Sequence, residues 1–303
     1  LTSVGYDLTF ATALVAVSGS LGIIIPPSIP YIMYCNASGA SISELFLAGF
    51  LPGVLIALCL MVYSYIYCKI HGEDKDKLNA KCMELRAKGL GTVLKEGFWA
   101  LMSPVIILGG IYGGICSPTE AATISIFYSL IVSLFIYRTI KIRDLPKIML
   151  EGIHSYAPIL IILSAAVAFA RVITLMNVAT IVSEAVLSAI SSKVVILLLI
   201  NVLLLFVGMI MDTGPAILVF TPVLLPVAEA IGVDPIHFGI IMCVNLAIGF
   251  VTPPMGANLF VASNLSKVSV FDIARKAVPF ILAFLIALLL ITFVPQISMF
   301  LLQ

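Results

Sequence analysis

The chain has 303 residues, of which 62% are hydrophobic and only 10% are charged, and its mean hydropathy is +1.22. A soluble domain of average composition has about 25% charged residues, so this chain has too little polar surface to cover itself in water. Its composition predicts a multi-pass membrane protein with the lipid bilayer as its solvent. The net charge of +1 excludes a broad basic face for nucleic acid. The six cysteines form no CxxC pair, and we expect free thiols.

In chain order, the apolar segments predicted to enter the membrane are 8–34, 45–68, 98–116, 121–137, 153–176, 194–227, 238–262 and 278–302. Three of them are interrupted by residues that break helices: GSLGIIIPPSIP at 19–30, MDTGPA at 211–216 and GFVTPPMGAN at 249–258. The sequence SPTE at 117–120 predicts a turn into a new helix with Glu120 in its first turn. Residues 177–192 predict a short amphipathic helix.

The distribution of basic residues predicts how these segments are oriented. The connector 69–96 carries seven Lys/Arg and the loop 138–148 carries four, so both are expected in the cytoplasm. The segments 36–43 and 228–236 contain no Lys or Arg and are expected outside. The apolar segment that contains MDTGPA then begins and ends on the outer side. It is therefore predicted to be a re-entrant hairpin with its tip near Asp212.

Two of the interrupted segments share their helix-breaking residues at a constant shift of 227 residues (253 − 26). The matched pairs are Pro26 with Pro253, Pro27 with Pro254, Gly22 with Gly249, Pro52 with Pro279, and Ser18 with Asn245. The predicted orientation threads the two copies in opposite senses, so the pattern indicates an inverted repeat, an architecture of secondary transporters. The alternative, two unrelated helices kinked by proline, does not explain the shared register of Pro52 and Pro279.

The predicted fold is therefore an all-α polytopic membrane protein with inverted repeats, discontinuous helices and a re-entrant hairpin. Residues 1–70 are the remainder of a first repeat, and residues 71–96 are a charged cytoplasmic connector. Residues 97–303 are a second repeat. It holds a helix pair, a span, the hairpin at 194–227, the broken helix at 238–262 and a final span.

The interruptions predict a site for a monovalent cation. Proline frees backbone carbonyls by removing their partner N–H, and glycine allows a ligand to approach closely. Neutral oxygens suit a hard ion such as Na⁺, whereas no His/Cys/carboxylate cluster is present for a transition metal, and the three histidines are expected at membrane interfaces. The predicted sodium-binding residues are Ser18, Gly19, Ser20, Gly22, Pro26, Asp212, Thr213, Gly214, Gly249, Thr252, Pro253, Gly256 and Asn258.

Two charged residues lie inside apolar segments, where ionisable groups are costly and usually functional. Asp212 is expected at the hairpin tip, and the alternative is a helix cap there. Arg171 is expected well inside a span, where it either snorkels, pairs with a carboxylate or attracts an anionic substrate. The predicted substrate-binding residues are Ser28, Asp212, Arg171 and Asn258.

Four motifs resemble the large membrane subunit of tripartite ATP-independent periplasmic (TRAP) transporters over essentially the whole chain. They are GSLGIIIPPSIP, GGICSPTEAA, GMIMDTGPAILVFTPVLLP and DPIHFGIIMCVNLAIGFVTPPMGANLF. The resemblance implies an elevator-type, Na⁺-driven importer of the ion-transporter superfamily in the bacterial inner membrane. It implies C4-dicarboxylate or sialic acid substrates, a periplasmic substrate-binding protein and a small membrane (Q) subunit.

This sequence differs from the family pattern in two respects. It begins just before the first broken helix, so the family's first re-entrant hairpin and half of the first ion site are expected upstream of Leu1. Arg171 stands where many members have an aromatic residue, and we expect it to mark a substrate subgroup.

Other classes of protein fit the sequence less well. An enzyme needs a nucleophile–base pair or a metal set, and only Asp212 is available, so no enzymatic activity or cofactor is predicted beyond Na⁺ as coupling ion. A channel would show pore-lining repeats of one sign or a carbonyl filter. A scaffold has no reason to break two helices inside the membrane. The remaining alternative is another sodium-coupled anion transporter of the same superfamily that works without a binding protein.

Overall fold

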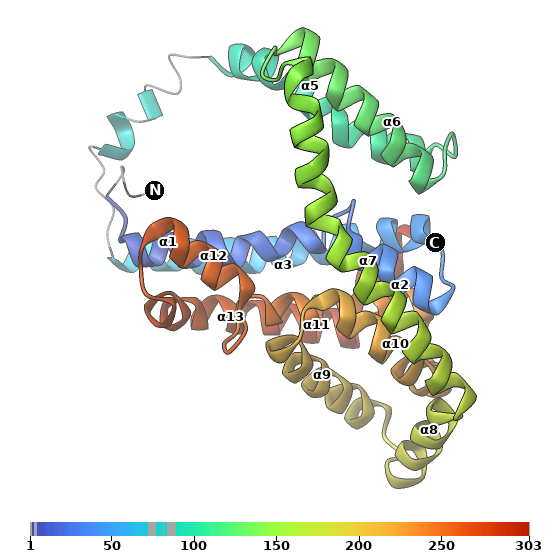
Figure 1. The fold of residues 1–303 in the computed structure, drawn as a ribbon. Helices are drawn as coiled ribbons and strands as arrows, with labels where there is room; N and C mark the ends of the chain where they lie inside the picture. Colours follow the sequence, from blue (N-terminus) through green and yellow to red (C-terminus); the bar gives the residue numbers. More distant parts are fainter. Residues whose placement is uncertain (1, 3–4, 72–76, 81, 84–88, 303) are drawn as a thin grey trace. The chain divides into compact units, whose positions relative to one another are not determined.

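The computed structural model describes the whole chain except residues 1, 3–4, 72–76, 81, 84–88 and 303. All regular elements among the described residues are helices (Figure 1). The chain divides into two compact units, the first made of Leu1–Asp74 and Leu163–Gln303 and the second of Lys75–Ile162. The described residues include seven helices that are long and apolar enough to cross a membrane. The protein is therefore an all-helical, multi-pass membrane protein, as its composition predicts.

The first unit holds both predicted broken helices and the predicted hairpin. Its elements are α1 (Leu8–Gly19), η2 (Ser20–Ile23), α2 (Ile29–Ser38), α3 (Ile42–His71), the end of α7 (Leu145–Leu175), α8 (Val178–Ala189), α9 (Lys193–Ile210), α10 (Thr213–Ala230), α11 (Pro235–Gly249), α12 (Ala257–Ser266), α13 (Val270–Phe293), α14 (Gln296–Met299) and η5 (Phe300–Leu302). The amphipathic helix expected at 177–192 is confirmed as α8.

Helix α11 forms the centre of this unit. Every residue from Ile236 to Gly249 is buried, which requires neighbours on all sides of the helix. It packs against α9, α10, α3 and α13. At the far end of the unit, Phe10 of α1 stacks on Tyr67 of α3, and Phe280 of α13 contacts Phe10. The two broken helices are thus part of one packed core.

The second unit is built around an antiparallel helix pair. Its elements are α5 (Leu90–Tyr112), α6 (Pro118–Ile131), a π-helical continuation η3 (Val132–Ile136), η4 (Ile142–Asp144) and the start of α7. The turn predicted from SPTE is confirmed, because Ser117 and Glu120 form a capping box at the start of α6. The Tyr137 hydroxyl donates to the Glu96 carbonyl of α5 across 2.7 Å. Part of the charged connector 71–96 lies outside the described residues.

The predicted hairpin is present as two helices, α9 and α10, joined by Met211 and Asp212. At its open end, the Lys193 ammonium donates to the Gly232 carbonyl across 3.0 Å, so the two outer ends lie together. Each arm has 18 residues and is itself a candidate span by length, so re-entry into the membrane stays a prediction.

Two predicted boundaries are wrong in the same direction. Helix α7 begins at Leu145 rather than at residue 153, and α13 begins at Val270 and ends at Phe293 rather than covering 278–302. Both helices start with a polar turn that hydropathy alone assigns to a loop, although Lys, Arg and Asp are good enough helix formers to continue an apolar helix into water.

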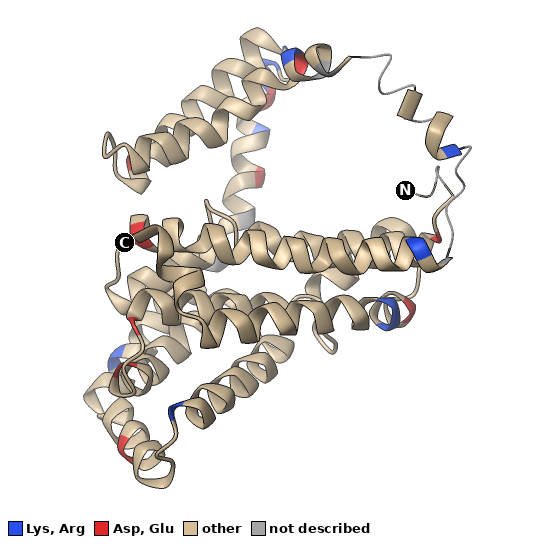
Figure 2. Ribbon diagram, turned by 180° about the vertical axis from the view of Figure 1, so that it is seen from behind, with Lys and Arg blue, Asp and Glu red and all other residues tan. Residues whose placement is uncertain are grey.

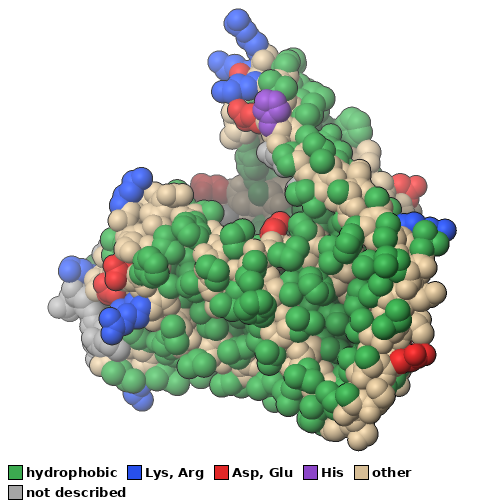
Figure 3. Space-filling view, turned by 60° about the horizontal axis from the view of Figure 1, so that its bottom comes forward, with side chains coloured by type: hydrophobic (Ala, Val, Ile, Leu, Met, Phe, Trp, Pro, Cys, Tyr) green, Lys and Arg blue, Asp and Glu red, His purple; other side chains and the backbone are tan. Residues whose placement is uncertain are grey.

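Charge and hydropathy are distributed as a bilayer demands. Figure 2 shows the charged residues of the first unit at helix ends and turns, and the middle of α3 and α13 has none. Large hydrophobic side chains such as Phe271, Leu265 and Ile115 are more than four-fifths exposed. Figure 3 shows hydrophobic side chains over much of the face that it draws. All six cysteines are free, as predicted.

Candidate ion and substrate site at the helix interruptions

The first interruption, residues 20–28, follows from the positions of two prolines. In a continuous helix, Pro26 and Pro27 would have to donate to the carbonyls of Gly22 and Ile23, which proline cannot do. Helix α1 ends at Gly19, η2 tightens the chain to Ile23, and α2 begins only at Ile29. The Ile23 carbonyl accepts instead from the Ser28 hydroxyl at 2.5 Å. Neither proline can satisfy the Gly22 carbonyl, so this oxygen is open to a ligand.

The second interruption, residues 250–256, repeats this pattern. Helix α11 ends at Gly249, and Pro253 and Pro254 withhold the hydrogen bonds that the Gly249 and Phe250 carbonyls would accept. The Thr252 N–H donates to the Gly249 carbonyl at 3.1 Å, and the Asn258 N–H donates to the Phe250 carbonyl at 3.0 Å. The Pro26–Pro27 and Pro253–Pro254 peptide bonds are both cis. The two interruptions therefore share their proline pairs at the shift seen in the sequence, but both affected carbonyls of the second accept backbone N–H groups, whereas those of the first do not.

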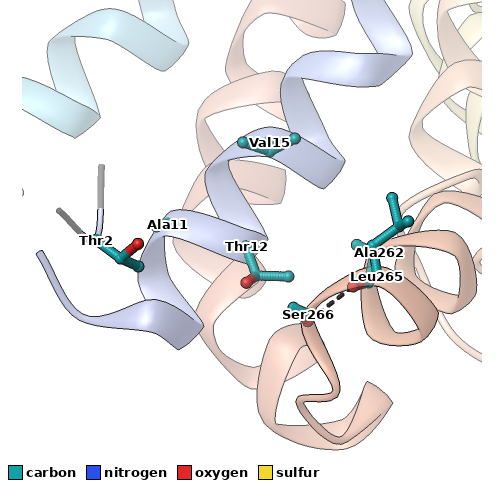
Figure 4. Close-up of a pocket in the computed structure, with 7 residues that line it drawn as sticks. All are labelled: Thr2, Ala11, Thr12, Val15, Ala262, Leu265 and Ser266. Carbon is teal, nitrogen blue, oxygen red and sulfur yellow. Dashed lines mark hydrogen bonds between the residues drawn. The ribbon is translucent and has the colours of Figure 1, made fainter.

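The two interrupted helices lie side by side and run in opposite directions. The Tyr34 hydroxyl near the end of α2 donates to the carbonyl of Pro235 at the start of α11 at 2.6 Å. In the middle, the Asn258 amide donates to the Ala16 carbonyl at 3.1 Å. At the other end, the start of α1 and the end of α12 border a cavity of about 350 Å³ (Figure 4). These three contacts fix an antiparallel pairing.

The cavity between α1 and α12 is poorly suited to an anion. None of the described residues that line it is charged. The Thr12 and Ser266 hydroxyls, both shown in Figure 4, donate to carbonyls of their own helices, Leu8 and Ala262, at 2.7 Å each. The cavity is therefore an apolar space beside the interruptions rather than a recognition site.

The hairpin turn contacts both interrupted helices. The Met255 N–H in the second interruption donates to the Met209 carbonyl at the end of α9 at 3.1 Å. Gly208 and Gly249 are in close backbone contact, because a Cβ placed on Gly249 would lie 2.1 Å from the Gly208 oxygen. On the α10 side, a Cβ on Gly214 would lie 3.1 Å from the Met33 sulfur of α2. The turn thus contacts the second interruption on one side and α2 on the other.

Asp212 stands at the N-cap of α10, but its side chain accepts no capping hydrogen bond. It is exposed, and within the described part of the chain it makes no ion pair or hydrogen bond with its carboxylate. A carboxylate whose only role was capping would bond the N–H groups two or three residues later. The geometry therefore gives no support to the capping alternative and leaves both oxygens available.

The hydroxyl groups predicted as ligands share one arrangement. The hydroxyls of Ser20, Ser28 and Thr252 donate to the carbonyls of Val17, Ile23 and Ile248 at 2.5, 2.5 and 2.7 Å. Each proton therefore points at the protein's own backbone, and the oxygen lone pairs remain for a cation. The Asn258 side chain donates with its nitrogen, which likewise leaves its oxygen as an acceptor.

The structure brings only part of the predicted set together. Gly19 and Asn258 are adjacent, because a Cβ on Gly19 would lie 3.3 Å from the Asn258 amide nitrogen. Thr213 and Gly214 are buried behind Asp212 in the first turn of α10. Gly256, in the left-handed conformation at φ +36°, forms the N-cap of α12. Arg171 is separate: it lines another cavity, with none of the interruption residues.

Sequence reasoning missed a buried polar network beside the site. The Asn245 amide donates to the Asn201 oxygen at 2.6 Å, and the Asn201 amide donates to the Thr292 hydroxyl at 3.2 Å. His237, in the first turn of α11, is 2% exposed, and its ring nitrogen lies 3.4 Å from the Thr292 carbonyl; its predicted interfacial depth stays a prediction. His237, Asn245 and Asn201 come together only when α9, α11 and α13 pack, so their sequence positions alone do not reveal the network. The one signal in the sequence is the match of Asn245 with Ser18.

Taken together, the fold and the site define a polytopic membrane protein whose centre consists of two antiparallel, interrupted helices and a helical hairpin that contacts both. The chain belongs to the DctM component family of tripartite ATP-independent periplasmic transporters, whose sequence model matches residues 1–297. It is thus a membrane subunit of a transporter family rather than an enzyme, as the motifs predicted.

Several curated relatives align with almost the whole chain. The isethionate TRAP transporter permease protein DctMQ of Oleidesulfovibrio alaskensis is 44% identical over 98% of this chain and 46% of its own length. The C4-dicarboxylate large permease protein DctM of Pseudomonas aeruginosa is 38% identical over 97% of this chain and 68% of its own length. The sialic acid TRAP transporter large permease protein SiaM of Vibrio cholerae is 35% identical over 98% of this chain and 68% of its own length. The chain thus spans between about half and two thirds of these relatives.

Proposed function

We propose that the protein forms part of a permease for sodium-coupled secondary import of a small organic acid across the bacterial inner membrane. The observation that carries this proposal is the antiparallel pairing of the two interrupted helices, with Asn258 against Ala16 and the hairpin turn between them. Two equivalent breaks threaded in opposite senses are what an inverted-repeat transporter uses to form its ion and substrate sites.

The proposed sodium sites consist of freed carbonyls and neutral side-chain oxygens at each interruption. At the first interruption, the ligands come from the Gly22 carbonyl and the Ser18–Gly22 segment. At the second, they come from the Thr252 hydroxyl, the Pro253 backbone and the Asn258 amide oxygen, because the Gly249 and Phe250 carbonyls already accept backbone hydrogen bonds. Asp212 supplies the negative charge that such a site otherwise lacks, and its attraction for a cation is stronger in a low-dielectric site than in water.

Substrate and partners are proposed from the chain's relatives. Their names specify C4-dicarboxylate, sialic acid and isethionate, which are all organic anions. We propose that the substrate is an acid of this kind, handed over by a periplasmic substrate-binding protein, and that a small Q subunit completes the permease. Movement of the first unit as an elevator would carry ions and substrate together.

A second candidate is a sodium-coupled anion transporter of the same superfamily that needs no binding protein. The two proposals differ in one measurable property, because only the first requires a soluble partner for uptake. Only a functional measurement can separate the two candidates, because either transporter would use the same interrupted helices.

The test is uptake into proteoliposomes that contain the full-length permease with its small subunit. A panel of radiolabelled organic acids is offered with and without the cognate binding protein, under inward Na⁺ or K⁺ gradients. Saturable uptake that needs both Na⁺ and the binding protein supports the proposal. Uptake without the binding protein favours the second candidate, and large uncoupled conductance would contradict both.

A further inference from the structure

Arg171 lies near the end of its helix. Helix α7 starts at Leu145, and Arg171 comes 26 residues later (171 − 145), one helical turn before the end at Leu175. That distance is about 39 Å along the helix at 1.5 Å per residue. The hydrocarbon core of a bilayer is about 30 Å thick. On the predicted orientation Arg171 stands near the outer end of α7, and its expected position inside a span stays a prediction.

Arg171 borders a cavity of about 490 Å³ formed by α7, α2 and α10 within the first unit. Asn36, in the last turn of α2, lines it, as do Arg171 and Thr174 of α7 and Leu218 and Pro222 of α10. Cavities that hold small ligands have volumes of about 300–1,000 Å³, with mostly apolar walls and a few polar groups. This cavity has both properties.

Two polar side chains of the cavity, Arg171 and Asn36, have donors without acceptors among the described residues, and the third, Thr174, bonds its own helix. Within the described part of the chain, no carboxylate lies within ion-pair distance of Arg171, and the Asn36 amide forms no hydrogen bond. The Thr174 hydroxyl donates to the Ala170 carbonyl at 2.9 Å. None of the lining residues carries a negative charge. A guanidinium at the edge of a membrane with no protein counter-charge is a site for an anion.

We propose that this cavity, with Arg171 and Asn36 as its recognising groups, is an outer acceptor site for the transported acid and that it takes acids with a single anionic group. The inference rests on the proposed import function. The guanidinium binds a sulfonate or carboxylate through paired N–H donors. The Asn36 amide forms a hydrogen bond with a neutral hydroxyl or carbonyl on the same molecule. The apolar walls of Leu218 and Pro222 exclude water behind it.

The charge balance of the cavity favours monoanions over dicarboxylates. Among the described residues that line the cavity, Arg171 alone is charged, so a monoanion is neutralised when it binds. A dianion would leave a second carboxylate against apolar walls with no partner, and burying an unpaired charge is strongly unfavourable. Among the acids that the relatives' names specify, isethionate and sialic acid carry one charge near neutral pH, whereas a C4-dicarboxylate carries two.

The test is equilibrium binding of radiolabelled isethionate to the purified full-length permease in phosphatidylcholine nanodiscs. We expect Arg171→Gln to weaken binding at least tenfold, Arg171→Lys to restore part of it, and Asn36→Ala to weaken it a few-fold. Arg143→Gln, which removes an equal charge from the loop before α7, is the matched control and should bind like wild type. Succinate should need at least a tenfold higher concentration than isethionate to compete.

Equal binding by wild type and Arg171→Gln would overturn the site, as would stronger binding of succinate than of isethionate. A second arm uses nanodiscs with phosphatidylglycerol. If the Arg171→Gln variant loses bound phosphatidylglycerol but not isethionate, the guanidinium holds a lipid headgroup and the proposal is wrong. The thermal stability of each variant separates loss of binding from misfolding. Arg171-dependent binding without sodium-driven uptake would contradict the proposed function but leave the site standing.

Discussion

Replacing Gly249 by alanine should break the contact between α9 and α11. The new Cβ would lie 2.1 Å from the carbonyl oxygen and 2.7 Å from the Cα of Gly208, both backbone atoms. Carbon atoms in contact are normally about 3.5–4.0 Å apart, so the helices must separate by roughly 1 Å. Overpacking of this kind costs about 1–3 kcal/mol. We expect the upper end of the range because no side chain can rotate away.

The sequence repeat provides the control for this prediction. Gly22 matches Gly249 at the shift of 227 residues, yet a Cβ on Gly22 has no atom within 4 Å. Gly22→Ala should therefore change stability by less than about 1 kcal/mol. Thermal melting of the purified variants measures both effects, and a loss of about 3 kcal/mol corresponds to roughly 5–10 °C for Gly249→Ala. Equal melting temperatures for the two variants would refute the close α9–α11 contact.

Further variants test the rest of the site. Asp212→Ala should abolish sodium-driven uptake while the protein stays folded. Asp212→Asn should also lose uptake, because the wild-type side chain makes no capping bond that Asn would preserve. Normal uptake by the alanine variant would make Asp212 dispensable. Asn245→Leu should lower the melting temperature, because it removes the hydrogen bond to Asn201 and leaves the buried Asn201 amide oxygen unpaired, at a cost of about 1–3 kcal/mol. Ser18→Ala, at the matched half-exposed position, should cost less. Single cysteines placed at residue 141 should escape an impermeant reagent added to intact cells, and their labelling would invert the topology.

The broken helices could be predicted because proline acts locally. Pro26, Pro27, Pro253 and Pro254 forbid particular hydrogen bonds wherever they stand, so the ends of α1 and α11 follow from sequence. Glycine is less informative by itself. The role of Gly208 as a contact point for Gly249 depends on how two helices cross, and its sequence surroundings resemble any apolar helix.

The sequence identified several residues of the candidate site but could not predict which of them contact one another. Asn258 was identified as a polar residue near a break, while its bond to Ala16, 242 residues away, required the packed fold. The start of α7 was misplaced because hydropathy places a helix start where charges end, whereas α7 continues through Lys147 and Glu151. Those two side chains lie 3.9 Å apart at i, i+4 spacing and are compatible with helix, a signal that hydropathy ignores.

The central claim is that the helix interruptions bind sodium, and equilibrium binding of ²²Na⁺ to the purified full-length permease tests it most directly. Wild-type protein should bind Na⁺ saturably, and K⁺ should not compete. Thr252→Val removes a side-chain oxygen while keeping the shape, so it should weaken Na⁺ binding about tenfold or more, as loss of one charge-assisted contact does. Thr252→Ser, which keeps the oxygen, should bind nearly as wild type does. Absence of saturable Na⁺ binding by the wild-type protein would contradict the account.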